Sequence, residues 1–112
     1  VLLRQRKWGL TVAGVAVRYR RRIRMFERIE MSSRLVSWDA RFFYIEQSMW
    51  KTNGECANHA MFRTAVTDSS GIVSPSRVAD ALGVTDKAPD LPPSFQAWST
   101  AEDARVWPPE KH

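Results

Sequence analysis

Three arginines at alternate positions are the residues of this sequence best suited to chemistry. Arg18, Arg20 and Arg22 would project from one side of an extended strand, because successive side chains of a strand point to opposite faces. A guanidinium group presents paired N–H donors that match two oxygens of a phosphate. The spacing therefore makes these arginines the best candidates for a phosphate-bearing ligand. The favoured interpretation is still a solvated face that keeps an edge strand from aggregating.

Two further side chains are candidates for the same kind of site. Tyr19 lies between the first two arginines, and His59 falls in the middle of a later strand pattern. A neutral imidazole can accept a proton near pH 7. No motif places a serine or cysteine nucleophile beside this histidine, so a hydrogen-bonded sheet histidine is the competing interpretation. Cys56 fits packing, and Asp39 fits the shaping of a turn.

The charge of the chain is concentrated at its N-terminal end. The net charge is +5, and residues 1–24 hold eight Lys or Arg and no Asp or Glu. Such an end favours an anionic partner, either a nucleic acid or a phosphate-bearing metabolite. One cysteine and two histidines offer neither an internal disulfide nor a zinc-type ligand set, so we expect a reducing, cytoplasmic setting and no metal.

Alternating apolar and polar residues predict that these side chains stand on an antiparallel sheet of four strands. The expected elements are a central hairpin over residues 27–50 that turns at Trp38-Asp39, a preceding strand over residues 11–24 and a returning strand over residues 56–67. Phe42 and Tyr44 share one face of their strand, whereas Phe43 and Ile45 share the other. Both faces of this strand should therefore be covered. Gly14 indicates a bulge or a close backbone approach.

Local signals mark the turns and helices. Asn53-Gly54 predicts a type I′ turn between the hairpin and the returning strand. Ser74-Pro75 predicts the start of a short helix, and a second helix is expected over residues 94–105. The first eight residues read as the end of a helix whose cations lie near its C-terminus.

The length fits a single domain, residues 1–112, with a helical extension over residues 75–107. Two short helices are a thin cover for four strands. The sequence starts with Val1 and not with Met. We therefore expect a piece of a longer protein, in which the missing apolar cover is a helix before Val1.

The order of several short motifs resembles a known family. The motifs are Arg18-Tyr19-Arg20-Arg21, Phe26-Glu27, Leu35-Val36-Ser37-Trp38-Asp39 and Phe43-Tyr44-Ile45-Glu46-Gln47. This order is similar to the second to fourth strands of hotdog-fold thioesterases of the 4-hydroxybenzoyl-CoA thioesterase-like group. The later stretches SPSRVADALG and PDLPPSFQAWSTAEDA are similar to the C-terminal segment of animal thioesterase-superfamily-member proteins. The resemblance covers residues 11–104.

The resemblance implies an α+β hotdog fold, in which a curved antiparallel sheet wraps around a long central helix. The first strand and most of that helix would be missing here. It also implies hydrolysis of acyl-CoA thioesters without a cofactor, by a homodimer or homotetramer that pairs through the strand of residues 11–22. The family's segment of an acidic residue followed by Gly/His-Met/Val-Asn-Asn is absent, so no catalytic residue is assigned and the catalytic carboxylate is expected upstream of Val1.

The remaining needs of such a reaction are a cationic site for the CoA phosphates and an apolar slot for the acyl group. The substrate-binding candidates are Arg18, Arg20, Arg22, Tyr19 and His59. The candidates for the slot are Val15, Val17, Tyr19, Phe42, Tyr44 and Phe62. Sheet core is the default interpretation for residues of this last kind.

Two other functions stay open. A non-catalytic hotdog module would bind acyl-CoA or serve in assembly. A basic nucleic-acid-binding β-module needs exposed aromatic side chains between the arginines, and only Trp8 and Tyr19 meet that condition, so it ranks last. The sequence contains no run of eighteen apolar residues, so it predicts no spanning helix. It gives no expectation about a membrane surface.

Overall fold

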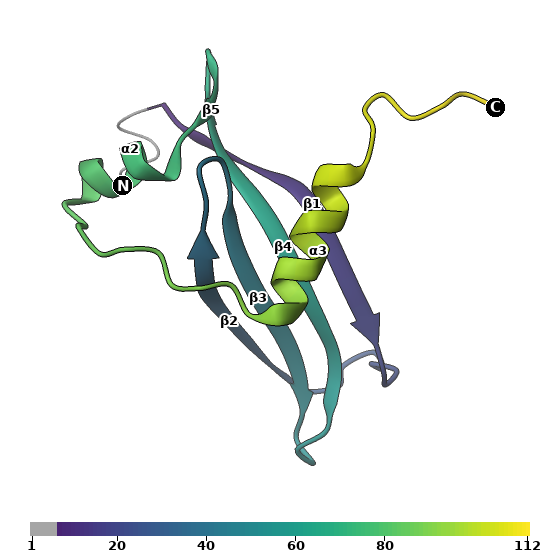
Figure 1. Cartoon of the computed structure of the whole chain (residues 1–112). Helices are drawn as coiled ribbons and strands as arrows, with labels where there is room; N and C mark the ends of the chain where they lie inside the picture. Colours follow the sequence, from purple (N-terminus) through teal and green to yellow (C-terminus); the bar gives the residue numbers. More distant parts are fainter. Residues whose placement is uncertain (1–6) are drawn as a thin grey trace.

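The part of the chain that the computed structural model describes, residues 7–112, forms one antiparallel sheet and two helices (Figure 1). The strands are β1 (Gly9–Tyr19), β2 (Ile29–Trp38), β3 (Phe43–Lys51), β4 (Cys56–Asp68) and β5 (Gly71–Val73), and the helices are α2 (Pro75–Leu82) and α3 (Pro93–Ala104). The four long strands lie in the order β1-β4-β3-β2, and β5 pairs with β4. The predicted hairpin and both predicted helices are confirmed. The predicted helix over the first eight residues falls mostly outside the described residues.

The short strand β5 corrects the predicted count of four strands. The Asp68 carboxylate accepts a hydrogen bond from the Ser70 backbone N–H at 2.8 Å, and Gly71 takes a φ of +123°. This tight turn returns residues 71–73 along the end of β4. Three residues are too few to show an alternating pattern, so the sequence indicated only a loop.

β1 ends at Tyr19, before the end predicted at residue 24. The backbone N–H groups of Arg20 and Arg21 both donate to the carbonyl of Ala57, at 2.9 and 3.0 Å. Two successive amides cannot share one carbonyl in a regular ladder, so the chain leaves the sheet here. Arg20 and Arg22 therefore belong to a loop, and the prediction that they alternate with Arg18 along one strand is wrong.

A bulge lies in β1 between Val12 and Gly14, as Gly14 indicated. The extra residue inverts the alternation of faces, so Val12 shares a face with Val15 and not, as predicted, with Ala16. A Cβ atom on Gly14 would lie 3.6 Å from the Trp98 side chain of α3. This is an ordinary van der Waals distance, so helix α3 packs against this strand without the contact requiring a glycine.

The turn between β3 and β4 is not the predicted type I′ turn. Gly54 has a φ of +91°, but Asn53 does not have a positive φ, and a type I′ turn needs positive values at both central residues. The carbonyl of Lys51 accepts from the Gly54 N–H at 3.0 Å, and the Lys51 N–H donates to the Glu55 carbonyl at 2.8 Å. The loop is a turn of three residues closed by a left-handed glycine.

Helix α3 covers one face of the sheet (Figure 1). Its Phe95 is 1% exposed and packs in a cluster with Val36, Phe42, Tyr44 and Ala65. The rings of Phe95 and Tyr44 lie 6.3 Å apart at an interplanar angle of 87°, which is a favourable edge-to-face arrangement. Phe43 packs in a separate cluster on the other face. The predicted division of these aromatic residues between the two faces is confirmed.

The opposite face is apolar and largely exposed. The register places on it five residues of β1 that are 37 to 76% exposed, namely Leu10, Val12, Val15, Val17 and Tyr19. Helix α2 and Trp8 pack at one end of this face, around Val66. A continuous apolar surface of this kind marks a contact site. The helix predicted to cover it lies outside the described residues and stays a prediction.

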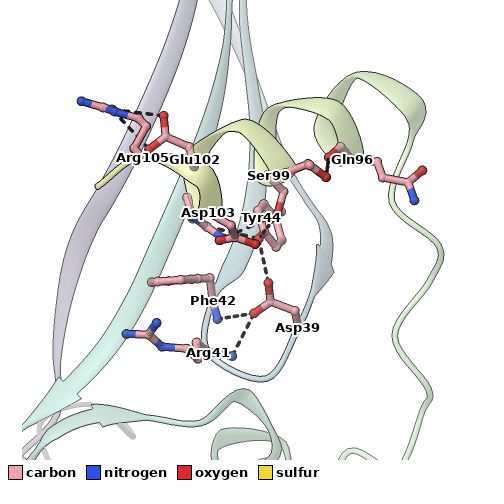
Figure 2. A network of polar contacts seen from close by, with 11 residues as sticks. Asp39, Arg41, Phe42, Tyr44, Gln96, Ser99, Glu102, Asp103 and Arg105 are labelled. Carbon is pink, nitrogen blue, oxygen red and sulfur yellow. Dashed lines mark hydrogen bonds and ion pairs between the residues drawn. The ribbon is translucent and has the colours of Figure 1, made fainter. Parts of the chain in front are cut away.

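A buried arginine fastens α3 to the sheet. Figure 2 shows Tyr44, Ser99 and Asp103, the residues that it contacts. Arg63 of β4 is 7% exposed, and its guanidinium lies 4.3 Å from the centre of the Phe42 ring. It donates hydrogen bonds to Asp103 of α3 at 2.6 Å and to the Tyr44 hydroxyl at 3.2 Å. The same hydroxyl lies 2.9 Å from the hydroxyl of Ser99. Two side chains of α3 are thus bound to one polar centre on the sheet.

Asp39 completes this centre and shapes the β2–β3 turn, as predicted. Its carboxylate accepts from the Tyr44 hydroxyl and from the backbone N–H groups of Arg41 and Phe42, all at 2.7 to 2.8 Å. Burial raises the pKa of Asp39, but the hydrogen bonds from Tyr44 and the two N–H groups outweigh it, so the pKa lies below its ordinary value. The group is therefore a charged acceptor at neutral pH.

We expect Arg63→Met to lower the free energy of unfolding by about 2 kcal/mol, because it removes the contact with Phe42 and a donor to the Tyr44 hydroxyl. Urea unfolding followed by circular dichroism measures this. The control is Asp103→Asn. The Asp103 side chain is 67% exposed, so this loss should be below about 1 kcal/mol. Equal losses in the two variants would contradict a role for Arg63 beyond its ion pair.

Candidate functional site

A row of polar side chains crosses four strands on the face that carries α3. Glu46 of β3 accepts hydrogen bonds from Arg34 Nε of β2 at 2.7 Å and from His59 Nε2 of β4 at 2.9 Å. Arg18 of β1 stands opposite His59 in the β1–β4 register. We call Arg34, Glu46, His59 and Arg18 the polar row. Neighbouring positions on adjacent strands are close enough for such contacts.

Glu46 orients the imidazole of His59. Hydrogen bonds from His59, and then from Arg34, lower the pKa of Glu46 below its ordinary value. A charged carboxylate can only accept, so Nε2 of His59 must carry the proton that it donates. In the neutral ring Nδ1 is then the open acceptor. The side chain of His59 is 36% exposed, so a ligand can reach it.

Two arginines meet this histidine at a small pocket. Arg18, Arg20 and His59 line a space of about 170 Å³ together with Cys56 and Asn58. Both arginines are exposed, and neither forms an ion pair with any residue from 7 to 112. The thiol of Cys56 donates to the carbonyl of Asn58 at 3.2 Å. The pocket therefore offers uncompensated cationic donors to an anion.

The structure brings together three of the five predicted site residues and separates the other two. Arg18, Arg20 and His59 share the small pocket. Tyr19 and Arg22 line an adjoining space of about 440 Å³, and Arg20 borders both. Tyr19 is 76% exposed and belongs to the apolar face, so it does not point with the polar row.

The predicted apolar slot does not exist as one feature. Phe42 and Tyr44 are buried beneath α3, whereas Val15, Val17 and Phe62 lie on the opposite face. Neighbouring side chains of a strand point to opposite faces. The predicted slot grouped six residues without the strand register, which decides the residues that share a face. An acyl group could lie only against the exposed apolar face.

Sequence reasoning missed Glu46 and Arg34. Glu46 lies diagonally across from His59, because Ser48 is the direct partner of His59 in the β3–β4 register. The register depends on the turn at residues 52–54 together with a register shift between Met49 and Trp50. Without that shift Ser48 would pair with Asn58, and His59 would point to the other face. No pattern in the sequence indicated the shift.

Within residues 7–112, no group of three or more His, Cys, Asp or Glu side chains is placed to hold a metal ion. The polar row contains one acid, Glu46, and both of its oxygens are engaged. What the site can do is bind an anion at its arginines and accept or donate a proton at His59.

Comparison with known proteins identifies the family. A sequence model of the thioesterase-like superfamily matches residues 1–99. The chain belongs to this superfamily. Over 39 residues it is 45% identical to Protein THEM6 of Xenopus laevis, a match that covers 35% of this chain and 19% of that protein. The chain thus spans less than two thirds of the curated relative.

Two solved structures share the fold of this superfamily member. YbaW, a probable thioesterase from Escherichia coli, superposes with a TM-score of 0.65 at 13% identity, over 72% of this chain and 64% of that one. A candidate oleoyl thioesterase from Lactobacillus plantarum gives 0.63 at 20% identity, over 81% of this chain and 37% of that one. The predicted hotdog fold class is confirmed, with a sheet that is open and not closed into a barrel.

We expect His59→Ala to raise the pKa of the Glu46 carboxyl toward 4.5, its ordinary value, because the stronger of its two hydrogen-bond donors is lost. Carbon-detected NMR titration of the side-chain carboxyls measures this. A lowered pKa stabilises the fold only while the group is charged, so this stabilisation is present above pH 4.5 and is lost as the pH falls through the folded-state pKa.

Arg34→Ala should raise the Glu46 pKa by a smaller amount, since Arg34 is the lesser cause. Arg77→Ala, on the exposed side of α2, should leave the titration unchanged. If the Glu46 pKa did not move in either polar-row variant, the hydrogen-bonded row would not exist in solution.

Proposed function

We propose that this chain binds an acyl-CoA thioester that the whole protein hydrolyses. The observation that carries the proposal is the pocket at which Arg18 and Arg20, exposed and without acidic partners among residues 7–112, adjoin His59. Arginine forks suit the phosphates of CoA. Membership of the thioesterase-like superfamily supports the reaction class.

The acyl chain of the substrate would lie against the apolar face of the sheet. Tyr19 and Arg22 adjoin the cationic pocket across Arg20, and Tyr19 also begins the row of exposed apolar residues along β1. The two faces meet near the end of β1, where the strand leaves the sheet. A ligand with phosphates and an aliphatic tail matches this juxtaposition of charge and apolar surface.

The attacking carboxylate is proposed to lie outside residues 7–112, upstream of Val1. Glu46 is held by Arg34 and His59, and Asp39 is held by Tyr44 and two backbone N–H groups. A carboxylate that is fixed by strong donors and has a lowered pKa is a weak base and a weak nucleophile. These two acids therefore position other groups.

Arg18→Gln and Arg20→Gln should each weaken the binding of CoA about tenfold, since each removes a charge-assisted hydrogen bond. Isothermal titration with CoA measures the dissociation constant. The matched control Arg77→Gln removes an equally exposed arginine from α2 and should have no effect. Unchanged affinity in both pocket variants would refute the assignment of the phosphate site.

The alternative is a non-catalytic module that binds acyl-CoA. It is favoured by the engagement of both acids described above. Turnover of acyl-CoA by the full-length protein, followed by mass spectrometry across chain lengths, separates the two. Hydrolysis establishes the thioesterase. Binding without hydrolysis establishes the module, and the absence of both excludes either role.

We also propose that two copies pair through β1 into a homodimer, which could pair again into a tetramer. Among the described strands β1 pairs only with β4, so its other edge is open to a second strand. Sedimentation equilibrium of the full-length protein should give the mass of a dimer or tetramer. A monomer at every concentration would contradict the proposed dimer but would leave the proposed phosphate site unaffected.

A further inference from the structure

The loop between β1 and β2, residues 20–28, presents two apolar side chains directly to solvent. Met25 is 84% exposed and Phe26 is 97% exposed. Phe26 also has a φ of +65°, a left-handed conformation that is unfavourable for a residue with a large side chain. Neither packing nor backbone preference accounts for this arrangement. Exposed apolar groups held in a strained conformation indicate a contact with something outside the chain.

The same loop is strongly cationic. Its five arginines are all exposed, and they are Arg20, Arg21, Arg22, Arg24 and Arg28. Arg21 pairs with Glu55 at 2.8 Å. Arg20, Arg22 and Arg28 form no ion pair with any residue of the described chain. The partner of this loop must therefore be anionic as well as apolar.

Glu27, the acidic residue of the loop, already has partners within the chain. The carboxylate of Glu27 pairs with Lys51 Nζ at 3.2 Å and accepts from the Arg24 backbone N–H at 2.9 Å. Hydrogen bonding from that N–H and from Lys51 lowers the pKa of Glu27. Glu27 thus stays charged and serves to fix the loop, and it does not neutralise the outward arginines.

The loop is anchored at its base. Lys51 Nζ also donates to the Arg22 carbonyl at 2.7 Å, which ties the loop to the β3–β4 turn. A space of about 550 Å³ remains between them, and its lining includes Arg22, Arg24, Glu27 and Lys51. Lys51 and Glu27 pair with each other there, so Arg22 and Arg24 are the cations that suit a phosphate group. Because these contacts already hold the loop in place, it loses less conformational entropy when it binds a partner.

We propose that this loop docks the chain on the surface of a bilayer that contains anionic phospholipids. Met25 and Phe26 enter the boundary between headgroups and acyl chains, and the arginines contact lipid phosphates. This combination of a small apolar insertion with surrounding cations is what interfacial binding requires. No helix in residues 7–112 is long and apolar enough to cross a bilayer, so within this part of the chain the contact is peripheral.

The position of the loop in the fold agrees with docking. The loop and the β3–β4 turn lie together at one end of the sheet, away from α2 and the C-terminal tail (Figure 1). That end can meet a flat surface without displacing either helix. An acidic protein is the other anionic partner to consider. Two almost fully exposed apolar side chains among exposed arginines are too small a patch for docking to a folded protein and suit insertion into a fluid surface better.

Flotation with phosphatidylcholine vesicles, with and without phosphatidylserine, tests the proposal on the purified chain. Binding should require phosphatidylserine and should fall as salt rises. Phe26→Gly should weaken binding at least about tenfold through the loss of the inserted ring. Phe26→Trp should retain it. Arg24→Gln and Arg28→Gln should each weaken it about fivefold.

Two control variants remove side chains of the same kinds outside the loop. Trp107→Ala removes an aromatic side chain that is 86% exposed in the C-terminal tail, and Arg77→Gln removes an exposed cation of α2. Both should leave vesicle binding unchanged. Phe26→Gly should also keep or raise the thermal midpoint, because glycine accepts a positive φ without strain. A loss of lipid binding with intact folding is then specific to the loop.

Several results would overturn the proposal. They are the absence of binding to phosphatidylserine vesicles, equal binding by Phe26→Gly, and loss of binding in the two control variants. If Phe26→Gly lowered the oligomeric mass instead, the loop would contact a second copy. If single-stranded RNA bound more tightly and displaced the vesicles, the partner would be nucleic acid. CoA binding by Phe26→Gly should be unchanged, so failure here is distinguishable from failure of the phosphate site.

Discussion

The register of the β3–β4 hairpin decides where the polar groups of this sheet meet. It places Tyr44 opposite Arg63 and Ser48 opposite His59, which leaves Glu46 diagonal to the histidine. The three-residue turn closed by Gly54 and the register shift between Met49 and Trp50 together set this alignment. A slip by one residue would send Arg63 and His59 to the apolar face. Both the attachment of α3 and the orientation of His59 would then be lost.

The two polar clusters on this face differ in burial and therefore in role. Arg63 is 7% exposed, and its hydrogen-bond partners lie within the fold, on β3 and α3. A charge in that position must be paired, and it specifies how the helix packs. The polar row lies beyond the helix, where His59 and Arg18 remain accessible. The cluster around Arg63 beneath α3 therefore has a packing role, whereas the polar row outside α3 is accessible to a ligand.

The features that sequence reasoning predicted correctly are those set by neighbouring residues. Ser74 caps α2 by accepting from the Arg77 N–H, Pro75 begins that helix, and Gly83 ends it with a φ of +73°. The alternation of Phe42, Phe43 and Tyr44 between two faces needs only the period of a strand. Local signals of this kind do not depend on the rest of the fold.

Most of the incorrect predictions concern contacts between segments distant in sequence; the turn type at Asn53-Gly54 and the missed strand β5 are the local exceptions. The end of β1 depends on Ala57, whose carbonyl receives two amides, and the face of Val12 depends on a bulge against β4. Arginines at alternate positions predict one face of a strand, but β1 ends at Tyr19, before Arg20 and Arg22. The pairing of Glu46 with His59 depends on the register shift between Met49 and Trp50, which no pattern in the sequence indicated.

The end of β1 also explains why the two proposed anion-binding surfaces adjoin. Arg18, the last arginine still in the strand, points with the polar row, whereas Arg22 has turned toward Lys51 and the exposed loop. Arg20 lies between them and borders the spaces on both sides. A chain docked through Phe26 would therefore hold the proposed CoA pocket near the lipid headgroups, with the apolar face continuing away from it along β1. On these two proposals, one departure of a strand from its sheet would supply both the phosphate site and the membrane contact, and different arginines of the run would serve each.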